Sequence, residues 1–244
     1  LAARRTERML FEGPHRGVLH MPTGAGKTRT AMHLVGSHLS GKEPTLVVWL
    51  AQNIELLDQA ADEFQKSWRF LGNRDVGLWR LWGNKRVDLT NAKDGLVVAG
   101  LGKMSALEKN AVNDLLTLAD RVSLVVIDEA HQAIAPTYRS VLDALATKRA
   151  TTRLLGLTAT PGRTWDDLSK DEELSDFFGR EKVMLEIEGH PDPVTYLMDE
   201  GYLARPRFRT LNVQAGLDLS QEDMQGLSQA IDVPGSVLER LGQS

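Results

Sequence analysis

Cysteine is absent from the sequence, and its absence excludes disulfide bonds and thiolate metal sites. The chain also lacks an apolar run of roughly 18 residues, so no membrane-spanning helix is predicted. The N-terminal stretch LAARRTERML is charged and has neither an apolar signal core nor an initiating methionine. We therefore expect a fragment of a longer, cytoplasmic protein that does not enter a membrane.

An excess of basic residues is also missing, since the formal net charge is −4 and the isoelectric point is near 5.9. This balance argues against a protein that coats nucleic acid with its whole surface, but it is compatible with a local phosphate-binding groove. Hydrophobic residues make up 42% and charged residues 25% of the 244 residues, close to the globular average. A chain of this kind can bury a sizeable core.

Short apolar segments alternate with longer helical patterns along most of the chain. Apolar, often β-branched segments that predict strands occupy residues 17–21, 45–50, 75–82, 96–99, 124–127 and 154–157. Helices are predicted at residues 27–39, 53–67, 103–119 and 137–147. This alternation predicts an α/β fold with a mainly parallel sheet, right-handed crossovers and helices on both faces.

The pattern changes after Pro161. Residues 164–178 are acidic and helix-prone, and residues 194–200 predict a short helix that ends at Gly201. Residues 205–213 alternate in a way that suits an edge strand, and the chain beyond residue 216 is polar and helix-prone.

The stretch MPTGAGKT at residues 21–28 ends like a phosphate-binding loop, between a predicted strand and a predicted helix. Gly24 and Gly26 allow the backbone to curl so that several N–H groups face one phosphate, beside the positive end of the helix dipole. Lys27 offers a mobile charge to the β- and γ-phosphates, and Thr28 offers a hydroxyl to Mg²⁺.

The start of this stretch departs from the usual pattern, because Met21 stands where the first glycine is expected. That position carries no ligand, so methionine is compatible with the loop if the chain leaves the strand without a positive φ. A glycine-rich turn with a chance lysine is the alternative interpretation.

A second motif makes that alternative unfavourable. The apolar segment VVI at residues 125–127 ends in Asp128 and Glu129, and a carboxylate at a strand end beside a phosphate loop is where a further Mg²⁺ contact belongs. Asp128 is the candidate metal partner, with a water molecule between its carboxylate and the ion. Glu129 is the candidate general base or water-orienting group. The alternative interpretation of Asp128 and Glu129 is a polar strand end followed by a helix cap.

Thr158-Ala159-Thr160-Pro161 follows the next predicted strand. Its two hydroxyls could bond to a neighbouring carboxylate or imidazole, although threonine-rich strand ends before proline are also common turns. Together the three stretches resemble motifs I, II and III of superfamily 2 DEAD/DEAH-box helicases, in the branch that resembles type III restriction enzymes. The resemblance covers roughly residues 17–209 and implies a RecA-like P-loop NTPase fold.

The resemblance implies roles for individual residues. The ATP-binding loop would comprise Thr23, Gly24, Ala25, Gly26, Lys27 and Thr28. Thr28 and Asp128 would hold Mg²⁺, and Lys27 and Glu129 would be catalytic. His131, Thr158 and Thr160 would couple hydrolysis to nucleic-acid binding. Gln52, Asn53 and Gly100 would contact nucleic acid, Gly100 only through its backbone because the family usually has threonine there.

The resemblance also implies an organisation and a function. Residues 1–212 would form the N-terminal RecA-like domain, and residues 213–244 would be a helical linker to a second RecA-like domain with arginines that complete the ATP site. The whole would hydrolyse ATP to move along DNA, favoured over RNA, with possible partner subunits in a restriction or defence complex. Two alternatives stay open: a double-stranded DNA translocase that does not separate strands, and a non-catalytic scaffold that binds ATP or nucleic acid.

Overall fold

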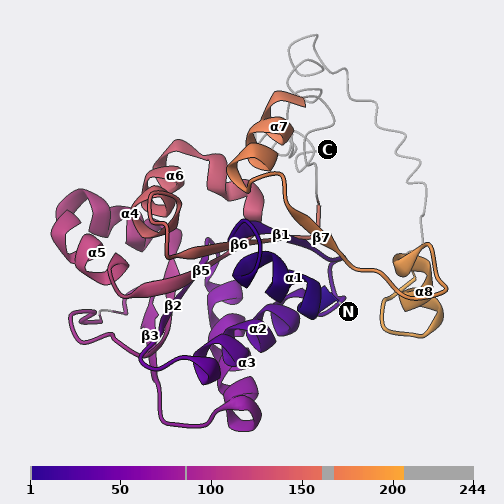
Figure 1. Cartoon of the computed structure of the whole chain (residues 1–244), viewed down its shortest axis with the longest axis horizontal. Coiled ribbons are helices and arrows are strands. Elements are labelled where there is room, and N and C mark those ends of the chain that lie inside the picture. Colours follow the sequence, from indigo (N-terminus) through magenta and orange to yellow (C-terminus); the bar gives the residue numbers. More distant parts are fainter. Residues whose placement is uncertain (1, 86, 161–167, 206–244) are drawn as a thin grey trace, which may run out of the picture. The chain divides into compact units, whose positions relative to one another are not determined.

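A seven-stranded sheet forms the centre of the computed structural model, which describes residues 2–85, 87–160 and 168–205 (Figure 1). The strands are β1 (Arg16–His20), β2 (Leu46–Ala51), β3 (Gly77–Leu81), β4 (Gly95–Gly100), β5 (Val122–Asp128), β6 (Arg153–Thr158) and β7 (Lys182–Met184). They are parallel and follow the order β3-β4-β2-β5-β6-β1-β7. The predicted parallel α/β fold is therefore confirmed.

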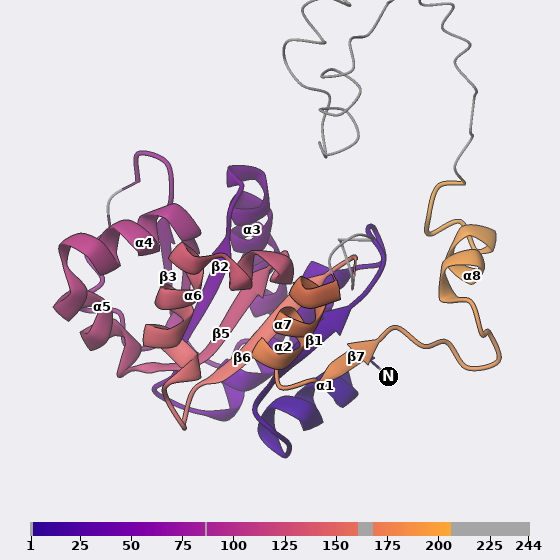
Figure 2. The same ribbon diagram turned by 90° about the horizontal axis from the view of Figure 1, so that it is seen from above.

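Helices cover both faces of this sheet. The α-helices are α1 (Ala2–Phe11), α2 (Lys27–Gly41), α3 (Ile54–Leu71), α4 (Leu101–Asn110), α5 (Val112–Ala119), α6 (Pro136–Leu142), α7 (Leu168–Phe177) and α8 (Pro193–Asp199). A 3₁₀ turn, η1 (Ala130–Ile134), and a π-helical turn, η2 (Asp143–Thr147), follow β5 and α6. In Figure 1, α1–α3 lie on one face and α4–α6 on the other, and Figure 2 looks onto the second group.

The central strands are buried on both sides because side chains alternate between two hydrophobic clusters. Trp49 and Val126 belong to the cluster that includes Phe64 of α3. Their neighbours Val48 and Val125 belong to the opposite cluster, with residues of α4–α7. Every residue of β2, β4 and β5 is buried, which explains why these strands read as continuous apolar runs.

Two elements were not expected from the sequence. The charged helix α1 buries one stripe at the spacing of an amphipathic helix, formed by Ala2, Thr6, Met9 and Leu10, so its sequence did carry a helical signal. Strand β7 has three residues, of which only Val183 is buried, and it forms because β1 offers a free edge for pairing.

Two predicted helices differ from the structure. The helix predicted at 103–119 is interrupted at Ala111, whose φ of −150° and ψ of 56° are not helical, so the chain forms α4 and α5. The break allows Met104 and Leu118 to enter the same hydrophobic cluster from two directions. The helix predicted at 137–147 ends in the π-helical turn η2 rather than in regular α-helix.

The described residues up to Ala204 belong to one compact unit. The predicted domain boundary between residues 212 and 213 lies outside the described residues, as does most of the predicted edge strand at 205–213. Among the described helices, none is long and apolar enough to cross a bilayer.

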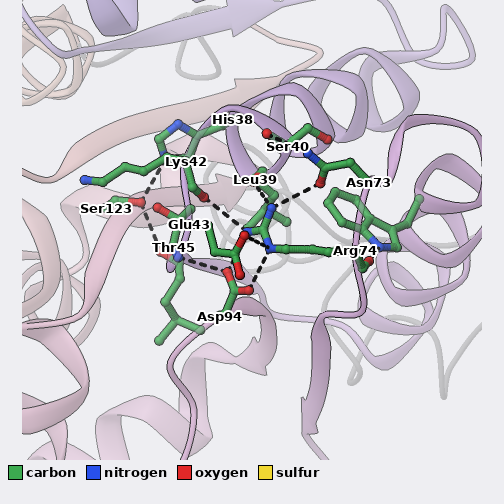
Figure 3. A network of polar contacts seen from close by, with 12 residues as sticks. His38, Leu39, Ser40, Lys42, Glu43, Thr45, Asn73, Arg74, Asp94 and Ser123 are labelled. Atoms are coloured by element: carbon green, nitrogen blue, oxygen red, sulfur yellow. Dashed lines mark hydrogen bonds and ion pairs between the residues drawn. The ribbon is translucent and has the colours of Figure 1, made fainter.

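Arg74 ties three segments together at the sheet edge where β2 and β4 begin (Figure 3). Its guanidinium binds Asp94 at two points, with Nε 2.8 Å from Oδ2 and Nη2 2.7 Å from Oδ1. It also donates to the carbonyl of Leu39 at 2.7 Å, near the end of α2. Asp94 Oδ1 accepts a further bond of 2.9 Å from the N–H of Thr45, just before β2. This paired guanidinium lowers the pKa of Asp94, and the network anchors the start of both strands.

His38 lies near the same edge, on α2 (Figure 3). Its Nε2 is 2.8 Å from Ser123 Oγ, and its ring stacks on Phe11 with centroids 4.9 Å apart. Burial, reinforced by the charges of Arg153 and Lys42, lowers the pKa of His38 from 6.5 to about 4. The imidazole is therefore neutral in the folded protein at neutral pH.

We predict that Arg74→Ala destabilises the protein by about 2 kcal/mol, because charge-assisted bonds are lost and Asp94 keeps an unpaired charge. Urea unfolding monitored by circular dichroism measures this change. Arg8→Ala is the matched control, since its 3.6 Å pair with Glu12 is solvent-exposed and is worth about 0.5 kcal/mol or less. An equal loss in both variants would contradict the anchoring role.

We predict that stability falls as the pH is lowered from about 6.5 to about 4, partly because of His38. The pKa of His38 is lower in the folded than in the unfolded protein, so the unfolded chain binds the proton first as the pH falls. Between the two pKa values this lowers the free energy of unfolding by roughly 1.4 kcal/mol per pH unit. Urea unfolding at pH 7.5 and pH 5 should show a smaller pH effect in His38→Gln than in the wild type. The same pH effect in both proteins would rule out His38 as its source.

Candidate active site

The glycine-rich loop leaves the carboxyl end of β1 and leads into α2. Gly24 and Gly26 take positive φ values of 80° and 85°, a backbone region that costs glycine little. Between them the N–H of Ala25 donates to the carbonyl of Pro22 at 3.1 Å, which closes a tight turn. Helix α2 then begins at Lys27, so its unpaired N–H groups face the curled loop.

Met21 does not take a positive φ. Its N–H donates to the carbonyl of Thr158 at 3.1 Å, which continues the pairing of β1 with β6 by one residue. Only 3% of Met21 is exposed, and it joins the hydrophobic cluster on the α1–α3 face. Methionine at this position is therefore compatible with the loop, as the sequence suggested.

Lys27 faces Asp128, the last residue of β5, and Glu129, which follows it. Its Nζ lies 3.7 Å from Asp128 Oδ1 and 3.8 Å from Glu129 Oε1. The side chain of Asp128 is 2% exposed, whereas that of Glu129 is 35% exposed. The structure thus brings together the lysine and both carboxylates that the sequence singled out, although 101 positions separate Lys27 from Asp128 in the sequence.

The two carboxylates differ in their surroundings. Burial raises the pKa of Asp128, while the Lys27 ammonium and the N–H of Glu129 act against this rise. The backbone N–H of Glu129 donates to Asp128 Oδ1 at 3.0 Å and helps to orient that carboxylate. Glu129 itself takes a left-handed backbone conformation, with φ 58° and ψ 70°. Such strain in a residue other than glycine is rare and concentrates at functional sites.

A cavity of about 280 Å³ opens beside this cluster. The phosphate loop lines it together with Asp128 and Glu129, and helix α3 contributes Leu56, Gln59 and Glu63. None of these three α3 residues was predicted from the sequence. Their spacing of three and four positions places them on one helix face, but a single sequence does not show that this face turns toward the loop.

The residues with proposed coupling roles gather near the same strand ends. His131 lies in η1, with Nδ1 3.5 Å from Glu129 Oε2 and Nε2 2.9 Å from Nε2 of Gln132. Thr158 ends β6, and its hydroxyl donates to the carbonyl of Thr160 at 2.8 Å and accepts from the N–H of Thr160 at 3.1 Å. The Thr158 hydroxyl thus shapes its own turn, in place of the expected bond to a carboxylate or an imidazole.

The three candidate nucleic-acid contacts lie at the ends of two neighbouring strands. Gln52 and Asn53 follow β2, both are exposed, and Asn53 precedes the first residue of α3. Gly100 ends β4 beside Ala51 of β2 and is buried. A Cβ added to Gly100 would meet Leu57 at 3.6 Å, an ordinary contact, so packing alone does not demand glycine there.

The donor set is compatible with a hard divalent cation. Asp128 and the Thr28 hydroxyl provide oxygen atoms, the ligands that Mg²⁺ prefers, and Mg²⁺ usually keeps several waters beside one or two protein groups. Within the described part of the chain, no group of three or more histidine, cysteine, aspartate or glutamate residues could hold a metal by itself. A cation here would therefore depend on water and on a phosphate ligand.

Two relatives share sequence with this domain. The mouse ATP-dependent RNA helicase DHX58 is 30% identical over 156 residues, which are 59% of this chain and 22% of that protein. The Drosophila melanogaster DEAD-box ATP-dependent DNA helicase Fancm is 28% identical over 159 residues, which are 61% of this chain and 10% of that protein. The chain thus matches less than a quarter of either relative.

Solved structures agree with these similarities. The helicase domain of Hef from Pyrococcus furiosus superposes with a TM-score of 0.55 at 27% identity, covering 78% of this chain and 39% of that one. The UvsW helicase of bacteriophage T4 has a TM-score of 0.54 over 75% of this chain and 59% of that one. At 17% sequence identity, this structural likeness shows the shared fold alone.

A family model described as "Type III restriction enzyme, res subunit" matches residues 1–163, more than half of the chain. The phosphate loop, the acidic pair after β5 and the threonine turn after β6 lie within this match. The chain therefore belongs to the family of the type III restriction enzyme res subunit and carries the N-terminal RecA-like motor domain of a superfamily 2 helicase.

Proposed function

We propose that this domain binds ATP with Mg²⁺ and that the whole protein hydrolyses ATP to ADP and phosphate to move along nucleic acid. The observation that carries the proposal is the approach of Lys27 Nζ to within 3.7 Å of Asp128 and 3.8 Å of Glu129, beside the curled loop. A loop that presents N–H groups, a mobile cation and two carboxylates of unequal burial has the parts that phosphoryl transfer needs.

Each residue has a distinct chemical task in this proposal. The N–H groups of residues 23–28 and the Lys27 ammonium stabilise the negative charge of the phosphates. Thr28 and Asp128 hold Mg²⁺, which when bound offsets charge on the phosphate oxygens. Glu129 is more exposed than Asp128 and lines the cavity, so it can accept a proton from the attacking water. A non-catalytic scaffold would not require this complete set.

The partners belong to the same proposal. DNA is the proposed track, supported by the restriction-enzyme description of the family, although one relative is named as an RNA helicase. Gln52 and Asn53 are exposed at the sheet edge where the phosphate loop lies, so a strand could pass over them. We further propose a second RecA-like domain that supplies arginines to the phosphates, a linker in residues 213–244, and His131, Thr158 and Thr160 as the coupling residues.

We predict that Glu129→Gln lowers the ATP turnover of the full-length protein by about 100-fold or more, because a lost general base costs that much. ATP binding should stay within a few-fold, since the amide has the same size. Steady-state phosphate release and calorimetric titration measure the two quantities. Glu55→Gln, an exposed change on α3, is the matched control. Wild-type turnover by Glu129→Gln would contradict the enzyme proposal.

We also predict that DNA stimulates the turnover of the full-length protein and that Asn53→Ala weakens this stimulation without changing basal turnover. The reason is that Asn53 is exposed beside the strand path and takes no part in the phosphate cavity. Phosphate release is measured against increasing DNA or RNA. Stimulation by RNA alone would overturn the choice of DNA, and stimulation by neither would overturn the motor proposal.

A further inference from the structure

A second cavity, of about 480 Å³, shares Gly24, Gly26 and Arg29 with the first. Helix α2 borders both cavities, but α1 and α8 border only the second, whereas α3 and the end of β5 border only the first. Its volume lies within the range of small-molecule sites, roughly 300–1,000 Å³. The phosphate loop therefore separates two cavities that differ in their walls.

The chemistry of the walls differs in the same way. The first cavity contains the carboxylates of Asp128 and Glu129, which suit a metal–phosphate group. The second contains His33, Leu197 and Tyr202 and is free of carboxylates among its described lining residues. Rings and an aliphatic side chain suit a flat, uncharged ligand. A molecule that lies across the loop would thus place its charged end in one cavity and its flat end in the other.

One face of α2 connects the two cavities. Arg29 and His33 are four residues apart, so they project from the same side of the helix, and both are exposed. Arg29 lines both cavities, whereas His33 lines only the second. A ligand that extends from the phosphates along α2 would meet Arg29 first and His33 next.

Tyr202 reaches the second cavity because of how α8 ends. Gly201 takes a φ of 76° and follows the last residues of the helix. The N–H of Tyr202 donates to the carbonyl of Leu197 at 2.8 Å, and the N–H of Gly201 donates to that of Met198 at 3.2 Å. These two bonds define a Schellman motif, which turns the chain back over its own last helical turn. Leu197 and Tyr202 are thereby held on the same wall.

The segment after this turn also contacts the phosphate loop. A Cβ added to Gly24 would lie 2.9 Å from Leu203 Cδ2, so Leu203 lies against the loop. Tyr202, by contrast, is 71% exposed although it is large and hydrophobic. A ring that adds little to the core and stands beside a phosphate loop is available to stack on a planar ligand.

We propose that the second cavity takes the ribose and base of the nucleotide and that Tyr202 stacks on the base. The inference rests on the proposed nucleotide-binding function and adds a residue far from the three motifs in sequence. Aromatic stacking accepts any base because each base has a π-face, so Tyr202 strengthens binding without selecting adenine. His33 borders the same ligand from α2.

The test compares ATP with inorganic tripolyphosphate, which has the phosphates but no nucleoside, by calorimetric titration of the full-length protein. Tyr202→Ala should weaken ATP binding by about tenfold, the loss expected for one stack, and leave tripolyphosphate binding unchanged. Tyr202→Phe should bind ATP like the wild type, because the ring is kept. Phe70→Ala is the control, since Phe70 is 88% exposed on α3 and lines neither cavity.

The outcomes separate the two proposals. If the wild type binds both ligands, Lys27→Ala weakens both and Tyr202→Ala changes neither, only the stacking role fails. If Tyr202→Ala weakens both ligands equally, the residue supports the loop and the stacking role again fails. If the wild type binds neither ligand, the nucleotide-binding function itself fails.

A second measurement uses the wild-type protein alone and does not depend on a variant that folds. Photolysis of bound 8-azido-ATP followed by peptide mass spectrometry should label the peptide that contains Tyr202 or the peptide that contains His33, and excess ATP should suppress the label. Specific labelling confined to α3 peptides would place the base in the first cavity and overturn the inference.

Discussion

The position of β6 between β1 and β5 determines where the groups of the candidate site lie. Its ladder pairs Thr158 with His20 on one side and Leu157 with Asp128 on the other. The phosphate loop and the acidic pair therefore leave the same sheet edge two strand spacings apart, about 10 Å. The long side chain of Lys27 spans most of this gap. A one-residue slip would turn Asp128 to the other face and separate the charges.

The charge of this cluster is unbalanced in a way that suits its proposed ligands. Lys27 offers one positive charge to Asp128 and Glu129, so the ionised cluster carries one surplus negative charge. A bound divalent cation would reverse that sign, and a triphosphate could then enter beside the loop N–H groups. Burial raises the pKa of Asp128, and the Lys27 ammonium acts against this rise. The strained backbone of Glu129 persists because β5 and η1 hold both sides of it.

Much of the sheet and the identity of the motifs could be predicted from the sequence, because strands buried on both faces must be continuous apolar runs. The break at Ala111 and strand β7 could not, since both depend on tertiary packing and on a free sheet edge. The positive φ of Glu129 could not be predicted either, because glutamate occurs in many backbone conformations and its identity does not indicate a left-handed one. The contribution of Gln59 and Tyr202 to the cavities depends on how α3 and α8 dock, which no single segment encodes.

Met21 shows how the loop is held in place without its usual first glycine. Because its N–H still pairs with Thr158, the hydrogen bonding between β1 and β6 continues to the residue before Pro22, and the positive φ values of the loop fall on Gly24 and Gly26. Burying a methionine side chain stabilises the fold by roughly 1.5–3 kcal/mol, and glycine at this position would lose that contribution. The base of the loop is thus anchored in the core while its tip keeps the freedom of glycine. The residues proposed to bind phosphate and the residue that fixes the base of the loop are separate here, so the first position can hold methionine while Gly24 and Gly26 keep the curl.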